Sequence, residues 1–85
     1  MRKTHLEISK ELGSTIKKCR KNLRLSQTEL ADLAGVSLNY ISQLEKGKPK
    51  IQLDKLLDVL GILGLELEVK PGNSRLVIGK GLRSE

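Results

Sequence analysis

Residues 25–47 read LSQTELADLAGVSLNYISQLEKG and contain the clearest structural signals of the sequence. Ser26 is followed by Glu29 at the spacing of a capping box, in which each side chain accepts a hydrogen bond from the other residue's backbone N–H. Gly35 suits a helix C-terminus, and Ser37 is the expected N-cap of a further helix. The pattern predicts two short helices joined by a tight turn.

The second of these helices is predicted to have one apolar and one polar face. With about 100° of rotation per residue, Ile41 and Leu44 fall on one side, whereas Asn39, Gln43 and Lys46 fall on the opposite side. Two such helices joined by a tight turn form a helix-turn-helix. In this motif the second helix enters the major groove of DNA, where Asn and Gln can each form two hydrogen bonds with adenine. The pattern therefore indicates DNA binding.

Helical spacing extends to both sides of this stretch. We expect a first helix to begin between residues 5 and 10 and to end near Asn22, because apolar residues recur there at spacings of three and four. Leucines between residues 53 and 63 repeat the same spacing and predict a fourth helix that ends at Gly64.

The period of the apolar pattern changes after the fourth helix. Apolar and charged residues alternate from Leu65 to Val69, which predicts a half-buried strand. Residues 71–74 are expected to form a turn, residues 76–78 a second short strand, and the remaining residues a mobile tail. Because an isolated two-stranded hairpin is marginal in water, we expect the first strand to pair with its copy in a second chain. The hairpin can also form and extend that shared sheet.

The whole chain has 85 residues, a formal charge of +6 and 38% apolar residues. This length suits one small domain, and a composition with 17 leucines and one aromatic residue favours helix over sheet. No stretch approaches the roughly 20 apolar residues that cross a bilayer, and no apolar signal-peptide core follows the basic start. We expect a soluble intracellular protein with no membrane partner.

The sequence gives little support to metal or catalytic chemistry. Cys19 is the single cysteine, and together with the single histidine, His5, it cannot supply the three or four ligands of a zinc site. No nucleophile and orienting group accompany His5. Gly61 and Gly64 lie in an apolar run that lacks the lysine of a phosphate-binding loop. We expect no metal, no cofactor and no enzymatic activity.

Positive charge is concentrated in the first quarter of the chain. Residues 1–24 carry eight Lys or Arg against two Glu, a net +6, whereas residues 25–50 are neutral, residues 51–70 carry −2 and residues 71–85 carry +2. A second basic segment, Lys48-Pro49-Lys50, follows the polar helix. Charged faces are often only solvated, so the charge alone does not separate a nucleic-acid surface from an ordinary one.

Residues 25–47 resemble the helix-turn-helix of the Xre, or lambda-repressor-like, family. The Ser-Gln start, the Leu-Ala pair, the Gly-Val-Ser turn and the Ile-Ser-x-Leu-Glu-x-Gly exit match that family, and the similarity covers roughly residues 8 to 64. The resemblance implies a mainly α fold, a lambda-repressor-like bundle of four to five helices with a short C-terminal strand that pairs across a dimer. It also implies sequence-specific repression of transcription.

The resemblance assigns roles to individual residues. It places Gln27 against DNA at the start of the second helix, and it turns four side chains of the third helix toward the bases: Leu38, Asn39, Ser42 and Gln43. Leu38 departs from the polar residue that is common in relatives. A partly buried ion pair is implied between Arg20 and Glu45. For the phosphates of a palindromic, double-stranded operator we expect contacts from Gln27, Tyr40, Lys46, Lys48 and Lys50.

The segment Leu-Gly-Leu-Glu-Leu-Glu-Val-Lys, residues 63–70, resembles the C-terminus of HipB-like antitoxins. These small DNA-binding dimers repress an operon that also encodes a kinase toxin. The resemblance implies a homodimer held by Leu65, Leu67 and Val69, and a HipA-like kinase toxin as a possible partner. We therefore expect residues 1–64 to form the DNA-binding domain and residues 65–85 to provide the dimerisation strand or hairpin with its tail.

Two alternatives to an antitoxin remain open. A phage-type or housekeeping regulator of the same family would have no toxin partner, and gene neighbourhood would separate it from an antitoxin. A protein-binding adaptor that no longer reads DNA would lack the basic rim, but Arg20, Lys46, Lys48 and Lys50 are present. In each case the resemblance implies a cytoplasmic protein of a prokaryote or phage, associated with the nucleoid when bound to DNA.

Overall fold

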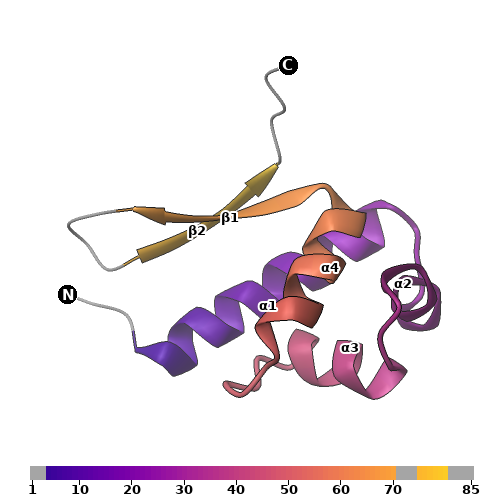
Figure 1. Cartoon of the computed structure of the whole chain (residues 1–85), viewed down its shortest axis with the longest axis horizontal. Helices are drawn as coiled ribbons and strands as arrows, with labels where there is room; N and C mark the ends of the chain where they lie inside the picture. The colour runs from indigo at the N-terminus through magenta and orange to yellow at the C-terminus, as the bar shows by residue number, and fades with distance from the viewer. Residues whose placement is uncertain (1–3, 71–74, 81–85) are drawn as a thin grey trace.

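The structure is a computed structural model that describes residues 4–70 and 75–80, with residues 69, 70, 75–78 and 80 described by their backbone alone. Within these residues the chain forms four helices and two strands: α1 (His5–Asn22), α2 (Gln27–Ala34), α3 (Leu38–Glu45), α4 (Leu53–Leu63), β1 (Leu65–Lys70) and β2 (Arg75–Lys80). The long helix α1 packs against α3, α4 and β2 (Figure 1). This arrangement confirms the predicted mainly α fold.

The helix ends form where the local sequence satisfies free backbone groups. The first two helices begin with complete capping boxes, and in α2 the Glu29 N–H donates to Ser26 Oγ at 3.0 Å while the Ser26 N–H donates to Glu29 Oε1 at 2.8 Å. Hydrogen bonds to the Glu29 carboxylate from the Ser26 backbone N–H, and then from the Ser26 side chain, lower the pKa of this carboxyl. Gly35 ends α2 with a φ of 70°, and Ser37 Oγ accepts the Tyr40 N–H at 3.0 Å to start α3.

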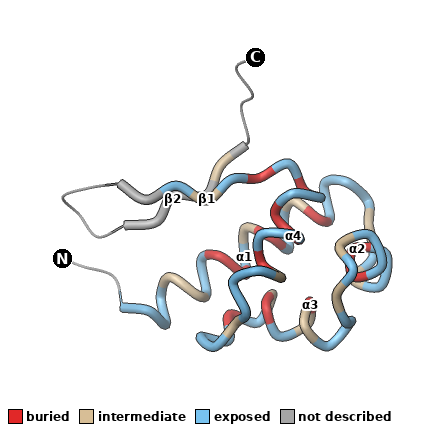
Figure 2. Tube along the Cα trace, in the orientation of Figure 1, coloured by how far each residue is buried: buried red, intermediate tan, exposed pale blue. Residues whose placement is uncertain are grey.

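The core is built from the inward faces of all four helices and the start of β1 (Figure 2). Its members are Leu12, Ile16, Leu30, Ala31, Ile41, Leu44, Leu56, Val59, Leu60, Leu63 and Leu65. Full burial of a Leu, Ile or Val side chain contributes about 1.5–3 kcal/mol relative to an exposed one. Because α2 and α3 supply four of these residues, the core fixes both helices relative to α1 and α4.

Helices α1 and α3 approach so closely at Gly13 that a side chain has no room there. A Cβ atom added to Gly13 would overlap the carbonyl oxygen of Leu44 and would lie 2.9 Å from the carbonyl oxygen of Glu45. The C-terminal end of α3 is therefore held directly against the backbone of α1.

Strands β1 and β2 form an antiparallel hairpin in which Leu65 pairs with Lys80 and Lys70 pairs with Arg75. The predicted first strand is present. The second strand is longer than predicted, because it covers six residues, 75–80, and not only residues 76–78. The first two residues of the predicted tail, Gly79 and Lys80, therefore belong to β2. The predicted turn at residues 71–74 and the rest of the tail, residues 81–85, lie outside the described residues.

The backbone hydrogen bonds of β1 are formed within one chain, whereas we expected β1 to pair with its copy in a second chain. One edge of β1 is paired with β2 of the same chain, so a second chain can pair only with its other edge. The hairpin is not isolated, because Leu65 is buried and Leu67 packs against the core. These contacts to the helices supply the apolar burial that a hairpin alone lacks in water.

Candidate nucleic-acid interface

Helices α2 and α3 pack together on either side of a tight turn. The Val36 N–H in this turn donates to the Ala31 carbonyl at 3.0 Å, which fixes the direction in which the chain leaves α2. Ile41 and Leu44 of α3 are almost completely inaccessible to solvent. The orientation of α3 is thus set by its buried face, and its opposite face is turned outward at the edge of the molecule (Figure 2).

The four predicted base-reading residues form one block on the outward part of α3. Leu38, Asn39 and Gln43 are exposed, and Ser42 is partly exposed. Residues four apart are neighbours on a helix surface, so Leu38 lies beside Ser42 and Asn39 lies beside Gln43. Asn39 and Gln43 lie on the face opposite the core, and Leu38 and Ser42 adjoin them on the flank between that face and the buried side.

Arg20 and Glu45, the pair that the resemblance implies, are in contact and nearly buried. Arg20 Nε donates to Glu45 Oε2 at 2.6 Å and Arg20 Nη2 donates to Glu45 Oε1 at 3.1 Å. Their side chains are 9% and 3% exposed. This two-point geometry is the strong form of an arginine–carboxylate pair, and the Glu45 carboxylate raises the pKa of Arg20.

Two further contacts extend this ion pair into a network. Arg20 Nη1 donates to the Leu25 carbonyl at 2.7 Å, and Gln27 Nε2 donates to Glu45 Oε1 at 3.0 Å. The network connects α1, the segment after it, the first residue of α2 and the last residue of α3. Gln27 uses one amide hydrogen for Glu45, which leaves its second amide hydrogen for a phosphate.

Tyr40 has a structural contact that the sequence did not reveal. Its hydroxyl donates to the Gln52 carbonyl at 2.9 Å, and Lys55 Nζ lies 5.8 Å from the ring centroid. Burial, and then the nearby charge of Asp54, raise the pKa of Tyr40 to about 12. The hydroxyl hydrogen thus ties α3 to the segment before α4, and Tyr40 can donate to a phosphate only by giving up Gln52.

The predicted phosphate-binding lysines follow α3 in the chain. Lys46 caps the C-terminus of α3, and Lys48 and Lys50 are exposed in the connection to α4. Buried Gly47 lies between the first two, and a Cβ there would come within 2.9 Å of the Lys10 Cα of α1. The connection is therefore held against α1 while its lysine side chains remain exposed to solvent.

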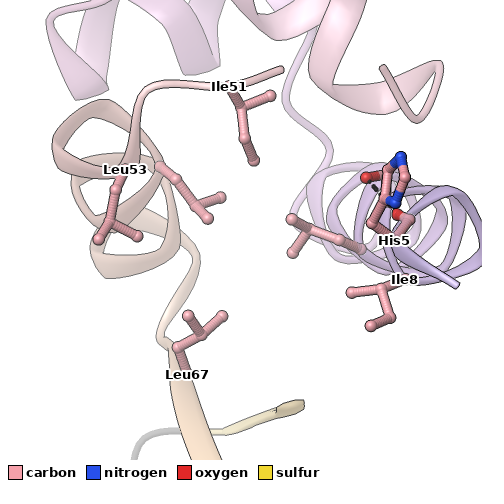
Figure 3. A pocket seen from close by; sticks show the side chains of 8 residues that line it. His5, Ile8, Ile51, Leu53 and Leu67 are labelled. Carbon is pink, nitrogen blue, oxygen red and sulfur yellow. Dashed lines mark hydrogen bonds between the residues drawn. The ribbon is translucent and has the colours of Figure 1, made fainter. Parts of the chain in front are cut away.

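The predicted dimerisation residues lie away from α3. Leu65 is only 8% exposed, because it belongs to the core of its own chain. Leu67 lines an apolar groove of about 230 Å³ together with Ile8, Ile51 and Leu53 (Figure 3). This groove is formed by α1, α4 with the segment before it, and β1. The side chain of Val69 lies outside the described part of the structure.

Two searches for other kinds of site gave negative results within residues 4–70 and 75–80. No helix there is long and apolar enough to cross a membrane. No group of three or more His, Cys, Asp or Glu side chains in this part of the chain could hold a metal ion.

Comparison with known proteins connects this geometry with a family. A helix-turn-helix family matches residues 16–70, a segment that includes α2, the turn, α3 and α4. The chain belongs to this helix-turn-helix family. Membership confirms the expectation of a transcriptional regulator that is not an enzyme.

Three relatives show the breadth of the similarity. An uncharacterised HTH-type transcriptional regulator, y4mF, of Sinorhizobium fredii is 42% identical over 66 residues, which are 76% of this chain and 87% of the relative. The immunity repressor protein of Bacillus phage phi105 is 32% identical over 78% of this chain, and the chain spans 46% of that repressor. The ImmF control region 10 kDa protein of the same phage is 33% identical over 85% of this chain and 80% of its own length.

Proposed function

We propose that this helix-turn-helix chain is a sequence-specific DNA-binding repressor of the phage-type or housekeeping kind. The observation that carries the proposal is the outward block of α3, where Asn39 and Gln43 lie opposite the buried face and Leu38 and Ser42 lie beside them. The Arg20–Glu45 network supports it, because it fixes the end of α3 to α1 and to the start of α2. The names of the relatives, which include a phage immunity repressor, favour the same function.

Base and phosphate contacts divide between two groups of residues in this proposal. Asn39 and Gln43 hydrogen-bond to base edges. Adenine is the preferred partner of both amide side chains. Gln27, Tyr40, Lys46, Lys48 and Lys50 contact phosphates and set the position of α3 in the groove. Of these, Tyr40 contributes chiefly by holding α3 through its bond to the Gln52 carbonyl.

A homodimer on a palindromic operator completes the proposal. In each chain, residues 1–64 read one half-site. Residues 65–85 join the two chains through the edge of β1 that is not paired with β2. Two recognition helices about 34 Å apart then enter successive major grooves on one side of the DNA. The outward block of α3 and the strand β1 belong to different parts of the fold, so both interfaces can be occupied together.

A HipB-like antitoxin with a HipA-like kinase toxin as partner is the second candidate. The observation that favours it is the strand segment directly after α4, whose sequence carries that resemblance. None of the three relatives described above is named as an antitoxin. A kinase gene in the same operon whose product forms a stable complex with this chain would favour the antitoxin, and an operon without one would favour the regulator.

Selection of bound sites from random DNA, followed by binding measurements on variants, tests the repressor proposal. Gln43→Ala should cost about 1–3 kcal/mol at the selected operator and little on random DNA, because only the operator offers the matching base edge. Lys48→Ala should weaken binding to both and lower the slope of log affinity against log salt by about one. Equal losses on both DNAs for Gln43→Ala would contradict the assignment, as would failure to enrich any sequence.

A further inference from the structure

One apolar side chain belongs to the otherwise polar block of α3. Leu38 is 48% exposed, and its neighbours Asn39, Ser42 and Gln43 carry amide or hydroxyl groups. Exposed leucines are common, as Leu33 at 58% shows, so exposure alone carries no conclusion. The position of Leu38 is informative because it is the first residue of α3, at the end of the helix that enters the major groove.

The contacts of its neighbours fix the backbone of Leu38 at the start of α3. The residue before it, Ser37, caps α3 through the hydrogen bond that its Oγ accepts from the Tyr40 N–H at 3.0 Å. Ile41, nearly one turn later, is completely buried, and the Tyr40 hydroxyl is bound to the Gln52 carbonyl. The first turn of α3 is thus fixed on both sides, and the Leu38 side chain is about half exposed to solvent at the N-terminal end of the helix.

The chemistry of the major groove restricts what an exposed leucine can contact there. Guanine, adenine and cytosine present hydrogen-bonding atoms along their edges, and the 5-methyl group of thymine is the one apolar group. A leucine placed against polar edges removes them from water without replacing their hydrogen bonds, which is unfavourable. Against thymine it buries one methyl group, which is favourable.

We infer that Leu38 is a specificity-determining residue that selects a thymine in each half-site by contact with its 5-methyl group. The inference rests on the proposed function, since it requires α3 to lie in the major groove of an operator. It identifies a base that the hydrogen-bonding residues beside it do not read. Asn39 and Gln43 recognise donors and acceptors, whereas Leu38 recognises a shape and an apolar surface.

Replacement of thymine by deoxyuridine tests this inference, because it removes the methyl group and keeps every hydrogen-bonding atom. Operators obtained by selection are synthesised with each thymine replaced in turn, and the dissociation constant of the full-length protein is measured for each. At one thymine position in each half-site, a single replacement should weaken binding about fourfold, which is the effect expected from the loss of one buried methyl group. In Leu38→Ala the same replacement should have no effect, because the contacting side chain has gone.

A matched variant separates this contact from general damage to the protein. Leu33→Ala removes an exposed leucine from α2, one that is somewhat more exposed than Leu38, and should retain the full deoxyuridine effect. The role of Leu38 would be overturned if deoxyuridine still weakened binding in Leu38→Ala, or if it weakened wild-type binding at no position. In both cases tight operator binding would still uphold the proposed function. Selection that enriches no sequence would instead reject the proposed function itself.

Discussion

Glu45 joins the C-terminal end of α3 to α1 and to the start of α2. Its carboxylate accepts hydrogen bonds from Arg20 and from Gln27, and it is 3% exposed. Glu45→Ala would leave the Arg20 guanidinium nearly buried without its counter-charge. Loss of one partner of a buried pair costs about 3–5 kcal/mol, and we expect a loss near the lower bound, about 3 kcal/mol. For a domain of this size the melting temperature should then fall by roughly 12 °C or more.

Thermal denaturation of a small set of variants checks this expectation. Arg20→Ala should cause a similar loss, because it leaves the Glu45 carboxylate buried with only Gln27 as a donor. Asp32→Ala, at an exposed position of α2, is the control and should change stability by less than about 0.5 kcal/mol. Shifts of about one degree in Glu45→Ala would mean that the pair behaves as a surface ion pair worth under about 1 kcal/mol.

The connection between α1 and α2 contains a strained residue that offers a prediction at the scale of elements. Arg24 has a φ of 60°, and it is the single non-glycine residue with positive φ in the described part of the chain. Its N–H donates to the Lys21 carbonyl at 2.9 Å, and the Leu25 N–H donates to the Arg20 carbonyl at 3.1 Å. This pair of bonds is a Schellman motif, in which glycine is the preferred residue at the position of Arg24.

Arg24→Gly should therefore stabilise the protein. Relief of the left-handed conformation gains about 1–2 kcal/mol, and the greater freedom of glycine in the unfolded chain offsets about 0.4–1 kcal/mol of it. The net gain of roughly 0.5–1 kcal/mol should raise the melting temperature by about 2–8 °C. Arg24→Ala retains the strain and removes the charge, so it should show no such rise; a lower melting temperature in the glycine variant would contradict the argument.

The ends of the helices could be predicted because short-range interactions set them. Ser26 and Ser37 bind N–H groups three residues away, and Gly35 ends α2 by its own backbone conformation. The outward block of α3 followed from the helical period in the same way. The predicted length of β2 was too short. Its length depends on the hairpin, which is stabilised by the contacts of Leu65 and Leu67 with the helices.

Apart from the Arg20–Glu45 pair, which the family resemblance implies, contacts between distant residues could not be read from the sequence. The approach of Gly13 to the end of α3, and the bond from Tyr40 to Gln52, depend on where whole helices lie. No local pattern distinguishes Gly13 from a glycine that is merely tolerated in a helix. Gln27 was expected only at DNA, and its bond to Glu45 emerges once α2 and α3 are packed together.

At the scale of the whole molecule, the shape of the hairpin limits how two chains can join. Leu65 and Leu67 face the helices of their own chain, whereas Glu66 and Glu68 are exposed. A second copy of β1 can add to the available edge in an antiparallel manner about a two-fold axis. If the axis passes near Leu67, the middle of the expected pairing segment, Glu66 lies opposite Glu68 of the partner subunit, and like charges opposite each other are unfavourable.

This geometry makes a charge reversal in β1 diagnostic for the dimer. Glu68→Lys converts two unfavourable Glu–Glu pairs into two Glu–Lys pairs, each worth roughly 0.2–1 kcal/mol, so the dimer dissociation constant should fall about 2- to 30-fold. Glu66→Lys creates the same two Glu–Lys pairs and should change the dissociation constant in the same direction. The double variant should lose the gain, because it places lysines opposite each other. Sedimentation equilibrium at low and high salt measures all four proteins, and the single-variant gains should shrink with salt. Equal dissociation constants for all four at low salt would exclude this pairing, and the proposed dimer would then have to form through another surface.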